Sequence, residues 1–410
     1  MCCNAHRLLF FKHTTTIYMN ILASISLKIR RNYRILRRNE WYKLAAQVFG
    51  KFFETFRQFP LSSFAIGYLF ITMAFCYWPI SHQWIFGFMM MTLPFAVLTG
   101  LAASAYLVFK KQRVLASTGF IWLLLAFPIM KRLVGNGSEK LFNDNGGSLK
   151  VLSFNSASFS GFPSDFKNWA DLKADIACFQ EYIPNAKLES QYAQKAECTN
   201  FQDGQNRTVG LALLSQYPIV KQYGKIWSRP NAPNVNGFLY ADIVYHQDTV
   251  RIVNTHFWSM GVRIENAYEA LRKGDIRTFG RELSDTFTRL KDGFKARNEQ
   301  IEEVEQYVAG SRYPVIICGD FNETPFGYAY GKLSLTFQNA FEEAGQGLGF
   351  TLNRNPYFVR IDQQFFSSDW EVKSCKTVSS VPFSDHFPLV AQYVLSKSTK
   401  DIGLLALNNR

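Results

Sequence analysis

Acidic residues are scarce in the first third of this chain, and part of that third lacks charge of either sign. Residues 1–150 contain 4 Asp and Glu against 18 Lys and Arg, and the 52 residues from Gln58 to Phe109 contain no charged side chain. One bilayer span needs about 20 apolar residues, and soluble domains seldom keep so long a segment uncharged. The absence therefore argues against an entirely soluble chain and predicts insertion into a membrane.

Other absences remove whole classes of protein. None of the seven cysteines stands in a C-x-x-C pair, so zinc ribbons and thioredoxin-like redox chemistry have no support, and no disulfide pairing can be assigned. The chain has no G-x-x-x-x-G-K-[ST] and no G-x-S-x-G motif, which excludes P-loop nucleotide hydrolases and α/β-hydrolases. A hydrophobic content of 48% excludes a disordered chain.

Three apolar segments are predicted to cross the membrane. The long uncharged run breaks near Pro79, where polar residues favour a turn, so that the first two spans cover about Leu61–Tyr77 and Trp84–Phe109. A third uncharged run covers Val114–Met130. Lys and Arg gather before the first span and between the second and third, which predicts a cytoplasmic N-terminus and a C-terminal domain outside the cytoplasm. We expect a multi-pass membrane protein.

The residues before the first span form a separate, basic segment. Apolar residues recur at helical spacing from Trp41 to Phe56, with Lys43 and Lys51 on other faces. This pattern predicts an amphipathic helix, which either lies on anionic lipid or extends the first span into the cytoplasm. No clear signal peptide precedes it, and the sequence leaves open whether translation starts at Met1 or Met19.

The composition changes after the third span. Residues 151–410 contain 27 Lys and Arg against 28 Asp and Glu, so this part is close to neutral. Short β-like runs alternate there with helical stretches, which is typical of one α/β domain. The chain is therefore divided into a basic cytoplasmic segment at 1–60, a three-helix membrane anchor at 61–133, a Gly- and Asn-rich linker at 134–147, an α/β domain at 148–396 and a tail at 397–410.

Eight apolar runs in this domain are predicted to be strands, and two regions are predicted to be helical. The strands are Leu149–Phe154, Ile176–Gln180, Val209–Leu214, Phe238–Tyr245, Val250–His256, Val315–Cys318, Val359–Phe366 and Pro388–Val394. Helices are expected at Asp165–Lys173 and across most of Glu265–Val308. Basic residues of the second region, Arg297 among them, alternate with acidic residues, which favours a solvated helix face.

Six of the strands place an acid, an amide or an imidazole near one end, where rigid scaffolds commonly carry chemistry. These residues are Asn155, Glu181, His256, Asp320 with Asn322, Asp362, and Asp385 with His386. Carboxylates such as Glu181 and Asp385 suit Mg²⁺. A carboxylate such as Asp320 can orient or deprotonate water, and an imidazole such as His386 needs a carboxylate to fix its tautomer.

In their order along the chain, these motifs resemble the endonuclease/exonuclease/phosphatase superfamily. The matching segments are Leu149–Asn155, Asp175–Glu181, Asn254–His256, Gly319–Asn322, Arg360–Asp362 and Ser384–Pro388. The resemblance covers about residues 148–396, and the apolar N-terminal part resembles a bacterial membrane-anchored subgroup, which implies a place in a bacterial inner membrane. It implies a four-layer α/β sandwich of two β-sheets flanked by helices, preceded by three transmembrane helices. It also implies that Glu181 binds Mg²⁺, or Mn²⁺ as a substitute, with Asn155 and Asp385 beside the same ion.

The same resemblance implies the roles of the remaining polar residues. Asp320 and Asn322 would position the attacking water and the scissile phosphate. His386, oriented by Asp362, would stabilise or protonate phosphate oxygens, and His256 would be the second imidazole. The identity of the general base stays open, with Asp320 as the first choice.

The expected activity is metal-dependent hydrolysis of a phosphoester at a membrane. A lipid headgroup or another phosphodiester outside the cytoplasm is favoured, because gripping DNA requires a basic surface and this domain is near neutral. A nuclease and a phosphomonoesterase remain alternatives. So does a catalytically silent binding module, against which the presence of Glu181, Asp320 and His386 argues. The expected partners are the bilayer and the phosphoester substrate, and the oligomeric state is open.

Overall fold

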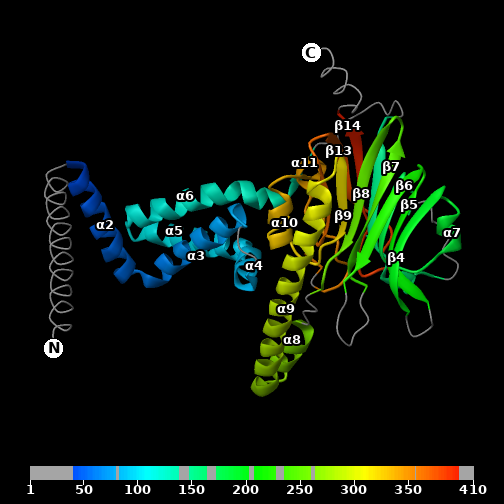
Figure 1. Cartoon of the computed structure of the whole chain (residues 1–410). Helices are drawn as coiled ribbons and strands as arrows, with labels where there is room; N and C mark the ends of the chain where they lie inside the picture. Colours follow the sequence, from blue (N-terminus) through cyan, green and yellow to red (C-terminus); the bar gives the residue numbers. More distant parts are fainter. Residues whose placement is uncertain are drawn as a thin grey trace, which may run out of the picture. The chain divides into compact units, whose positions relative to one another are not determined.

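The computed structural model describes residues 40–79, 83–137, 147–163, 172–202, 207–227, 235–259, 264–355 and 357–396 (Figure 1). The chain divides into two compact units, Met1–Tyr68 with Thr99–Trp122 and Leu69–Leu98 with Leu123–Arg410. Several predicted segments lie wholly or largely outside the described residues. They are the start of the basic segment, most of the linker, the helix expected at Asp165–Lys173 and the tail at 397–410.

The apolar part of the chain forms helices at the predicted places. These are α2 (Glu40–Gln58), α3 (Pro60–Tyr77), α4 (Trp84–Met91), α5 (Leu93–Phe109) and α6 (Arg113–Met130), followed by the 3₁₀ helix η1 (Lys131–Leu133). Among the described residues, α3 and the segment Arg113–Leu133 are each long and apolar enough to cross a bilayer. Two helices therefore meet this criterion, and a third span depends on α4 and α5.

The expected second span is not one straight helix. The axes of α4 and α5 differ by 57°, so the pair is either one broken span or a re-entrant segment. The break falls at Thr92, whose hydroxyl and amide both donate to the carbonyl of Met89, at 2.7 and 3.0 Å. Pro94 follows in the first turn of α5, where its missing N–H is tolerated but where it cannot continue the hydrogen bonding of α4. The sequence thus predicts three spans, and the structure supports two to three.

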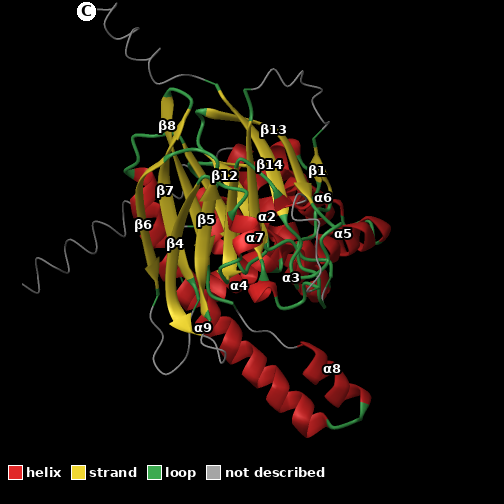
Figure 2. Ribbon diagram, turned by 90° about the vertical axis from the view of Figure 1, so that its right-hand side faces the viewer, coloured by secondary structure: helices red, strands yellow, loops and turns green. Residues whose placement is uncertain are grey.

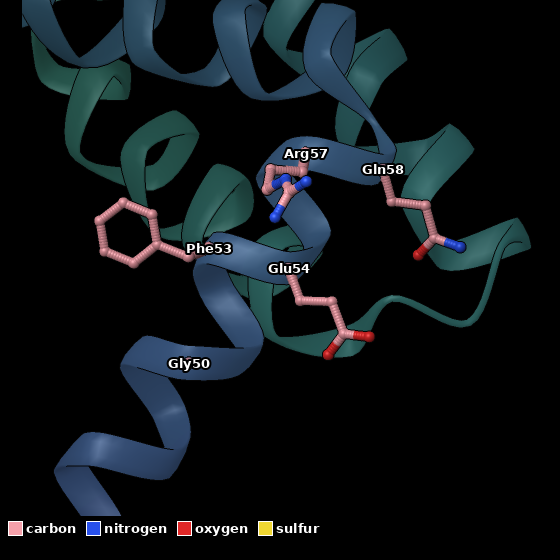
Figure 3. A pocket seen from close by; sticks show the side chains of 5 residues that line it. All are labelled: Gly50, Phe53, Glu54, Arg57 and Gln58. Atoms are coloured by element: carbon pink, nitrogen blue, oxygen red, sulfur yellow. The ribbon is translucent and has the colours of Figure 1, made fainter.

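The expected amphipathic helix is α2. A shallow pocket on α2 is lined by Gly50, Phe53, Glu54, Arg57 and Gln58 (Figure 3). None of the predicted site residues lines it. Phe49 and Phe53 are 65% and 63% exposed, so α2 presents aromatic side chains on its surface.

The C-terminal part contains two six-stranded mixed sheets (Figure 2). The first has the order β13 (Trp370–Thr377), β14 (Leu389–Leu395), β2 (Leu149–Asn155), β3 (Ile176–Tyr182), β5 (Thr208–Ser215) and β4 (Gln194–Gln202). The second has the order β10 (Gln338–Asn339), β12 (Asp362–Phe366), β9 (Val315–Asp320), β8 (Asp248–His256), β7 (Gly237–Tyr245) and β6 (Ile219–Ile226). The pairs β2–β3 and β8–β9 are parallel, and the other ladders are antiparallel.

The central strands are apolar on both faces because both faces are covered. In β2, Leu149 and Val151 pack in the core between the two sheets, whereas Leu152 and Phe154 pack on the outer side. The two-residue period of a strand sends alternate side chains to opposite faces. Continuous apolar runs in the sequence therefore mark strands that lie between two layers of packing.

Helices lie on both sides of the paired sheets. The crossover from β8 to β9 runs through α8 (Ile264–Arg272) and α9 (Ile276–Ala309), and α9 and α10 (Tyr328–Leu333) cover the outer side of the second sheet (Figure 1). The short α7 (Ala186–Glu189) and the 3₁₀ turn η2 (Ala157–Phe159) lie on the side of the first sheet. Two mixed sheets flanked by helices are the predicted fold class.

Two further contacts join α4 and the residues after η1 to other elements within the unit Leu69–Leu98 with Leu123–Arg410. The Gly87 backbone of α4 lies so close to α9 that a Cβ atom there would stand 2.8 Å from Cδ1 of Phe294. Directly after η1, β1 (Gly135–Asn136) pairs with β11 (Gln346–Gly347), beyond α11 (Ala340–Ala344). The first residues of the predicted linker therefore form a strand of the folded unit. The backbone of Gly135 can come this close to Gly345 because glycine has no side chain.

All eight predicted strands are present, with ends shifted by up to three residues. The strands that sequence reasoning misses are β4, β6 and β13, each at a sheet edge, and the two-residue strands β1, β10 and β11. Most residues of β6 are exposed, and Lys221, Gln222 and Lys225 interrupt its apolar side chains, so the sequence gives no continuous apolar run.

Candidate active site

The predicted polar residues meet at one edge of the two sheets. Asn155 ends β2, His256 ends β8, Asp320 ends β9 and Asp362 begins β12. Asp320 is in register with both His256 on one neighbouring strand and Asp362 on the other. Glu181 lies near the end of β3, beside β2. Parallel and antiparallel pairing together thus bring these side chains to the same place.

The buried carboxylate of Asp320 is the centre of the cluster. Its Oδ2 accepts hydrogen bonds from Nδ2 of Asn155 at 3.0 Å and from Nδ2 of Asn322 at 3.1 Å. The Nε2 atoms of His256 and His386 lie 3.5 and 3.6 Å from the same oxygen. Burial raises the pKa of Asp320, while the two imidazoles act in the opposite direction. A buried carboxylate with a raised pKa is a better proton acceptor than an exposed one.

The Gly-Asp-Phe-Asn sequence forms the turn that holds Asp320. Gly319 has φ +145°, and a Cβ atom there would collide with the carbonyl oxygen of Thr255 on β8. Asn322 adopts the left-handed conformation with φ 49°, which asparagine tolerates better than most residues. Its amide donates to Oδ1 of Asp320 at 2.8 Å, and its side chain also donates to the carbonyl of Phe257 at 2.9 Å. The Gly-Asp-Phe-Asn motif is therefore needed for the backbone conformation of this turn as well as for the chemistry of the site.

Glu181 is aimed at the site by an irregularity in β3. The β3–β5 register shifts between Phe179 and Tyr182, and Glu181 has a left-handed φ of 48°. Bulges of this kind re-aim side chains and are common beside active sites. The Oε1 of Glu181 lies 3.4 Å from Nδ2 of Asn155 and 3.8 Å from Nε2 of His256, and the side chain is 34% exposed.

His386 is held in the site by Asp362 and Ser384. Nδ1 of His386 lies 2.9 Å from Oδ2 of Asp362, and both side chains are buried. The hydroxyl of Ser384 accepts from the His386 amide and donates to the carbonyl of Asn155, at 3.2 and 2.7 Å. Burial by itself lowers the pKa of His386, but the charges of Asp362 and Asp320 outweigh it and raise the pKa to about 10.

Asp385 lies at the more open side of the cluster. Its side chain is 35% exposed, and its Oδ2 lies 3.4 Å from Nη1 of Arg354, which the sequence analysis did not single out. Among the described residues, no hydrogen bond or ion pair joins Asp385 to Glu181 or to Asp320. The structure therefore gathers seven of the eight predicted side chains into one network of contacts and places Asp385 next in sequence to His386.

Three residues of the cluster could together hold a metal ion. Carboxylate oxygens of Asp320 and Asp362 and a ring nitrogen of His386 lie within 4.8 Å of one another. Within the described part of the chain, Oδ1 of Asp362 is buried without a hydrogen-bond partner. Glu181, whose carboxylate is partly exposed, is not one of these three residues and stays the predicted principal ligand. Carboxylate and amide oxygens are the ligands that Mg²⁺ prefers.

One prediction about α9 is wrong. Arg297 is fully buried, not on a solvated face, and the nearby Gln300 is 5% exposed. Arg297 shares a face of α9 with Phe294, Ile301 and Val304, all buried, so it interrupts an apolar stripe at helical spacing. That helical spacing is the sequence signal from which the burial of Arg297 could have been predicted. The alternating charges on the other faces of α9 favoured an exposed position instead.

Comparisons with known proteins agree with this picture. A sequence model of the endonuclease/exonuclease/phosphatase family matches residues 152–386. No curated protein matches the chain at a significant level. Solved structures that resemble it include an endonuclease/exonuclease/phosphatase from Beutenbergia cavernae, with 15% identity, 61% of this chain and 72% of that chain covered, and a TM-score of 0.45.

Two other similar structures are the 3′ phosphatase NExo from Neisseria, bound to a product DNA hairpin, and the catalytic domain of human Nocturnin with a bound sulfate. The first has 17% identity, covers 59% of this chain and 98% of that chain, and has a TM-score of 0.42. The second has 15% identity, covers 60% and 94%, and has a TM-score of 0.39. The family assignment rests on the sequence model, whose match spans more than half of the 410 residues. The chain belongs to the endonuclease/exonuclease/phosphatase family.

Proposed function

We propose that this protein is a membrane-anchored, divalent-metal-dependent phosphodiesterase. The family acts hydrolytically on phosphoesters. The observation that carries the proposal is the surroundings of Asp320, whose Oδ2 is contacted by two carboxamides and faces two imidazoles. Such an arrangement can accept a proton from water and at the same time present hydrogen-bond donors to a phosphoryl group.

Each residue has a separate task in the proposed reaction. Asp320 orients the attacking water and accepts its proton, which its burial favours. His256 donates to oxygens of the phosphoryl group as charge develops on them. Asn322, whose side-chain N–H groups donate to Asp320 and to the Phe257 carbonyl, holds the central carboxylate in place. His386, oriented by Asp362 and kept protonated beside it, protonates or stabilises a phosphate oxygen. A cation held by Glu181, with Asn155 and Asp385 beside it, would supply Lewis-acid stabilisation of the phosphoryl oxygens.

A lipid headgroup or another phosphodiester outside the cytoplasm is the proposed substrate class. Two observations favour it over DNA. The residues from 151 onward carry 27 basic against 28 acidic side chains, so they offer no general excess of positive charge for a phosphate backbone. The helices α3 and α6 are also apolar enough to keep the protein at a bilayer, where lipid phosphodiesters are concentrated. A nuclease remains the second candidate, because a local basic surface can suffice.

The test uses the full chain purified in detergent. Hydrolysis of bis(p-nitrophenyl) phosphate is measured with Mg²⁺, with Mn²⁺ and with a chelator, for the wild type and for Asp320→Asn and His386→Asn. His246→Asn is the matched control, because His246 is exposed and its left-handed φ of 53° suits asparagine. Metal-dependent turnover that is lost in both site variants and kept in the control supports the proposal. Turnover that persists in Asp320→Asn would contradict it.

A second comparison addresses the substrate. The same preparations are given vesicles of sphingomyelin or phosphatidylcholine, single- and double-stranded DNA, and p-nitrophenyl phosphate. Release of a phosphorylated headgroup, at rates well above DNA cleavage, supports the lipid substrate. Preferential cleavage of DNA would favour the nuclease, and hydrolysis of the monoester alone would favour a phosphatase. A folded protein that binds metal but hydrolyses none of these would favour the silent binding module.

A further inference from the structure

Arg297 occupies an unusual position between α9 and the two loops that carry the site. Its side chain is fully buried, and its guanidinium lies over the ring of Phe294 at 5.0 Å. Its ion-pair partner is Glu323, directly after Asn322, with Nε 3.4 Å from Oε2 and with both side chains 0% exposed. None of the roles assigned above uses this buried pair.

Arg297 contacts the backbone of both catalytic loops with one nitrogen. Nη1 donates to the carbonyl of Trp258 at 3.0 Å and to the carbonyl of Asn322 at 3.2 Å. Trp258 follows His256 by two residues at the end of β8, and Asn322 follows Asp320 by two residues at the end of β9. One guanidinium therefore joins the two segments that present the imidazole and the central carboxylate.

Gln300 completes the attachment from the next turn of the helix. Its Oε1 accepts a hydrogen bond from the amide of Trp258 at 2.9 Å. Residues three apart lie on the same face of a helix, so Arg297 and Gln300 hold the carbonyl and the amide of one residue. The loops are joined to each other as well, because Phe257 donates its amide to the carbonyl of Asp320 and accepts from the side chain of Asn322, both at 2.9 Å.

A buried ion pair is a poor means of adding stability, because desolvation of both charges opposes their attraction. An apolar side chain at position 297 would extend the stripe of Phe294, Ile301 and Val304. Only a guanidinium, however, presents several N–H groups in a fixed plane to two carbonyls and a carboxylate together. The geometry of Arg297 is thus better explained by placement of the loops than by packing.

We propose that Arg297 is a positioning residue, which with Gln300 fixes the loop after His256 relative to the loop that carries Asp320 and Asn322. The inference rests on the proposed function for its catalytic readout, but the placement of the loops can be tested without activity. By holding the carbonyl of Asn322, Arg297 keeps this residue in its left-handed conformation, from which the side chain reaches Oδ2 of Asp320.

The first test compares Arg297→Lys with Arg289→Lys in the full chain. Lysine keeps the charge beside Glu323 but cannot reproduce the fixed fork, whereas Arg289 is an exposed residue of the same helix. For Arg297→Lys we expect kcat to fall by about 100-fold with KM changed by less than about threefold, since small misplacements of reacting groups have effects of that size. Arg289→Lys keeps the wild-type values. A loss confined to KM, or no loss, would overturn the proposal.

A double-variant comparison separates positioning from general destabilisation. If Arg297 acts through Asn322, the losses in kcat for Arg297→Lys and Asn322→Ala will not multiply in the combined variant, because both remove the same arrangement. Fully multiplicative losses would show that Arg297 acts elsewhere and would contradict the inference.

Hydrogen exchange gives a readout that does not need turnover. In Arg297→Lys, the amides of Trp258 and Asn322 should exchange at least about tenfold faster, while those in the middle of β8 and β9 keep their protection. Gln300→Leu should affect Trp258 alone. Uniformly faster exchange across the domain, or a change confined to α9, would refute the positioning role. If the faster exchange is confined to the two loops but the wild-type protein hydrolyses no phosphoester, the positioning role of Arg297 is supported and the proposed function is rejected.

Discussion

The carboxylate of Asp362 lies 2.9 Å from Nδ1 of His386, and both side chains are only a few per cent exposed. This contact fixes Nε2 as the atom that faces Oδ2 of Asp320. Because the ring is enclosed, the second carboxylate determines both the tautomer and the charge of the imidazole that faces the substrate.

Asp362→Asn should therefore reduce hydrolysis by about 100-fold or more while the protein stays folded, since general acid–base contributions are of that order. The neutral amide no longer favours the protonated imidazole. Initial rates and circular dichroism of the full chain provide the measurement, and Asp292→Asn, on an exposed part of α9, is the control. Equal activity of the two variants would count against the assigned role of Asp362.

The raised pKa of His386 has a consequence for stability in the absence of metal. The pKa of about 10 in the folded protein lies above the ordinary histidine value of 6.5. The folded state therefore binds the proton more tightly, and this stabilisation is complete below about pH 6.5 and is lost as the pH rises toward about 10. With a chelator present, the difference in Tm between the wild type and His386→Asn should shrink across this window. A difference that grows with pH would contradict the assignment.

Gly319→Ala should destabilise the domain by about 2–4 kcal/mol, because the new methyl group collides with the Thr255 carbonyl at a backbone conformation that alanine disfavours. The strands β8 and β9 would have to separate at the site, so hydrolysis is lost as well. Gly280→Ala is the matched control in α9, where a Cβ atom meets nothing within 4 Å. That change should stabilise the protein by about 0.5–1 kcal/mol. Denaturant unfolding provides the measurement: the free energy of unfolding should fall in Gly319→Ala and rise in Gly280→Ala.

Glu181→Gln should raise the Mg²⁺ or Mn²⁺ concentration needed for half-maximal activity by at least about tenfold, because an amide is a weaker ligand than a carboxylate for a hard cation. The exposed Glu299→Gln variant should titrate like the wild type. Isothermal titration of metal-free protein measures the affinity independently of turnover. Unchanged metal binding in Glu181→Gln would assign the ion to other residues, such as the trio of Asp320, Asp362 and His386.

The number of spans can be decided by parity. If α3, the bent pair α4–α5 and Arg113–Leu133 all cross, the two ends of the chain lie on opposite sides of the membrane, and if only α3 and Arg113–Leu133 cross, they lie on the same side. The distribution of Lys and Arg predicts opposite sides, with the N-terminus in the cytoplasm. A C-terminal alkaline phosphatase fusion should then be active and a C-terminal fluorescent protein dark. A bright fluorescent fusion would favour two spans.

The sequence predicted the strand-end residues well because the signal is local: a buried apolar run followed by a polar residue. It could not predict the direction of the Glu181 side chain, since the register shift in β3 depends on pairing with β5. Arg297 was misjudged because its burial depends on where α9 docks. The break between α4 and α5 was missed although Pro94 marked it, since hydropathy averages over the kink.

The pairing of β1 with β11 determines how far the catalytic unit can travel. Only Val134 separates η1 from β1, so very few residues lie between the last apolar helix and the first strand. In the proposed membrane-anchored hydrolase, such a short connection confines the search for substrate to a thin layer above the lipid. Turnover would then depend on the surface density of the substrate in the bilayer and would fall when inert lipid dilutes that substrate. It would depend little on the total volume of the sample.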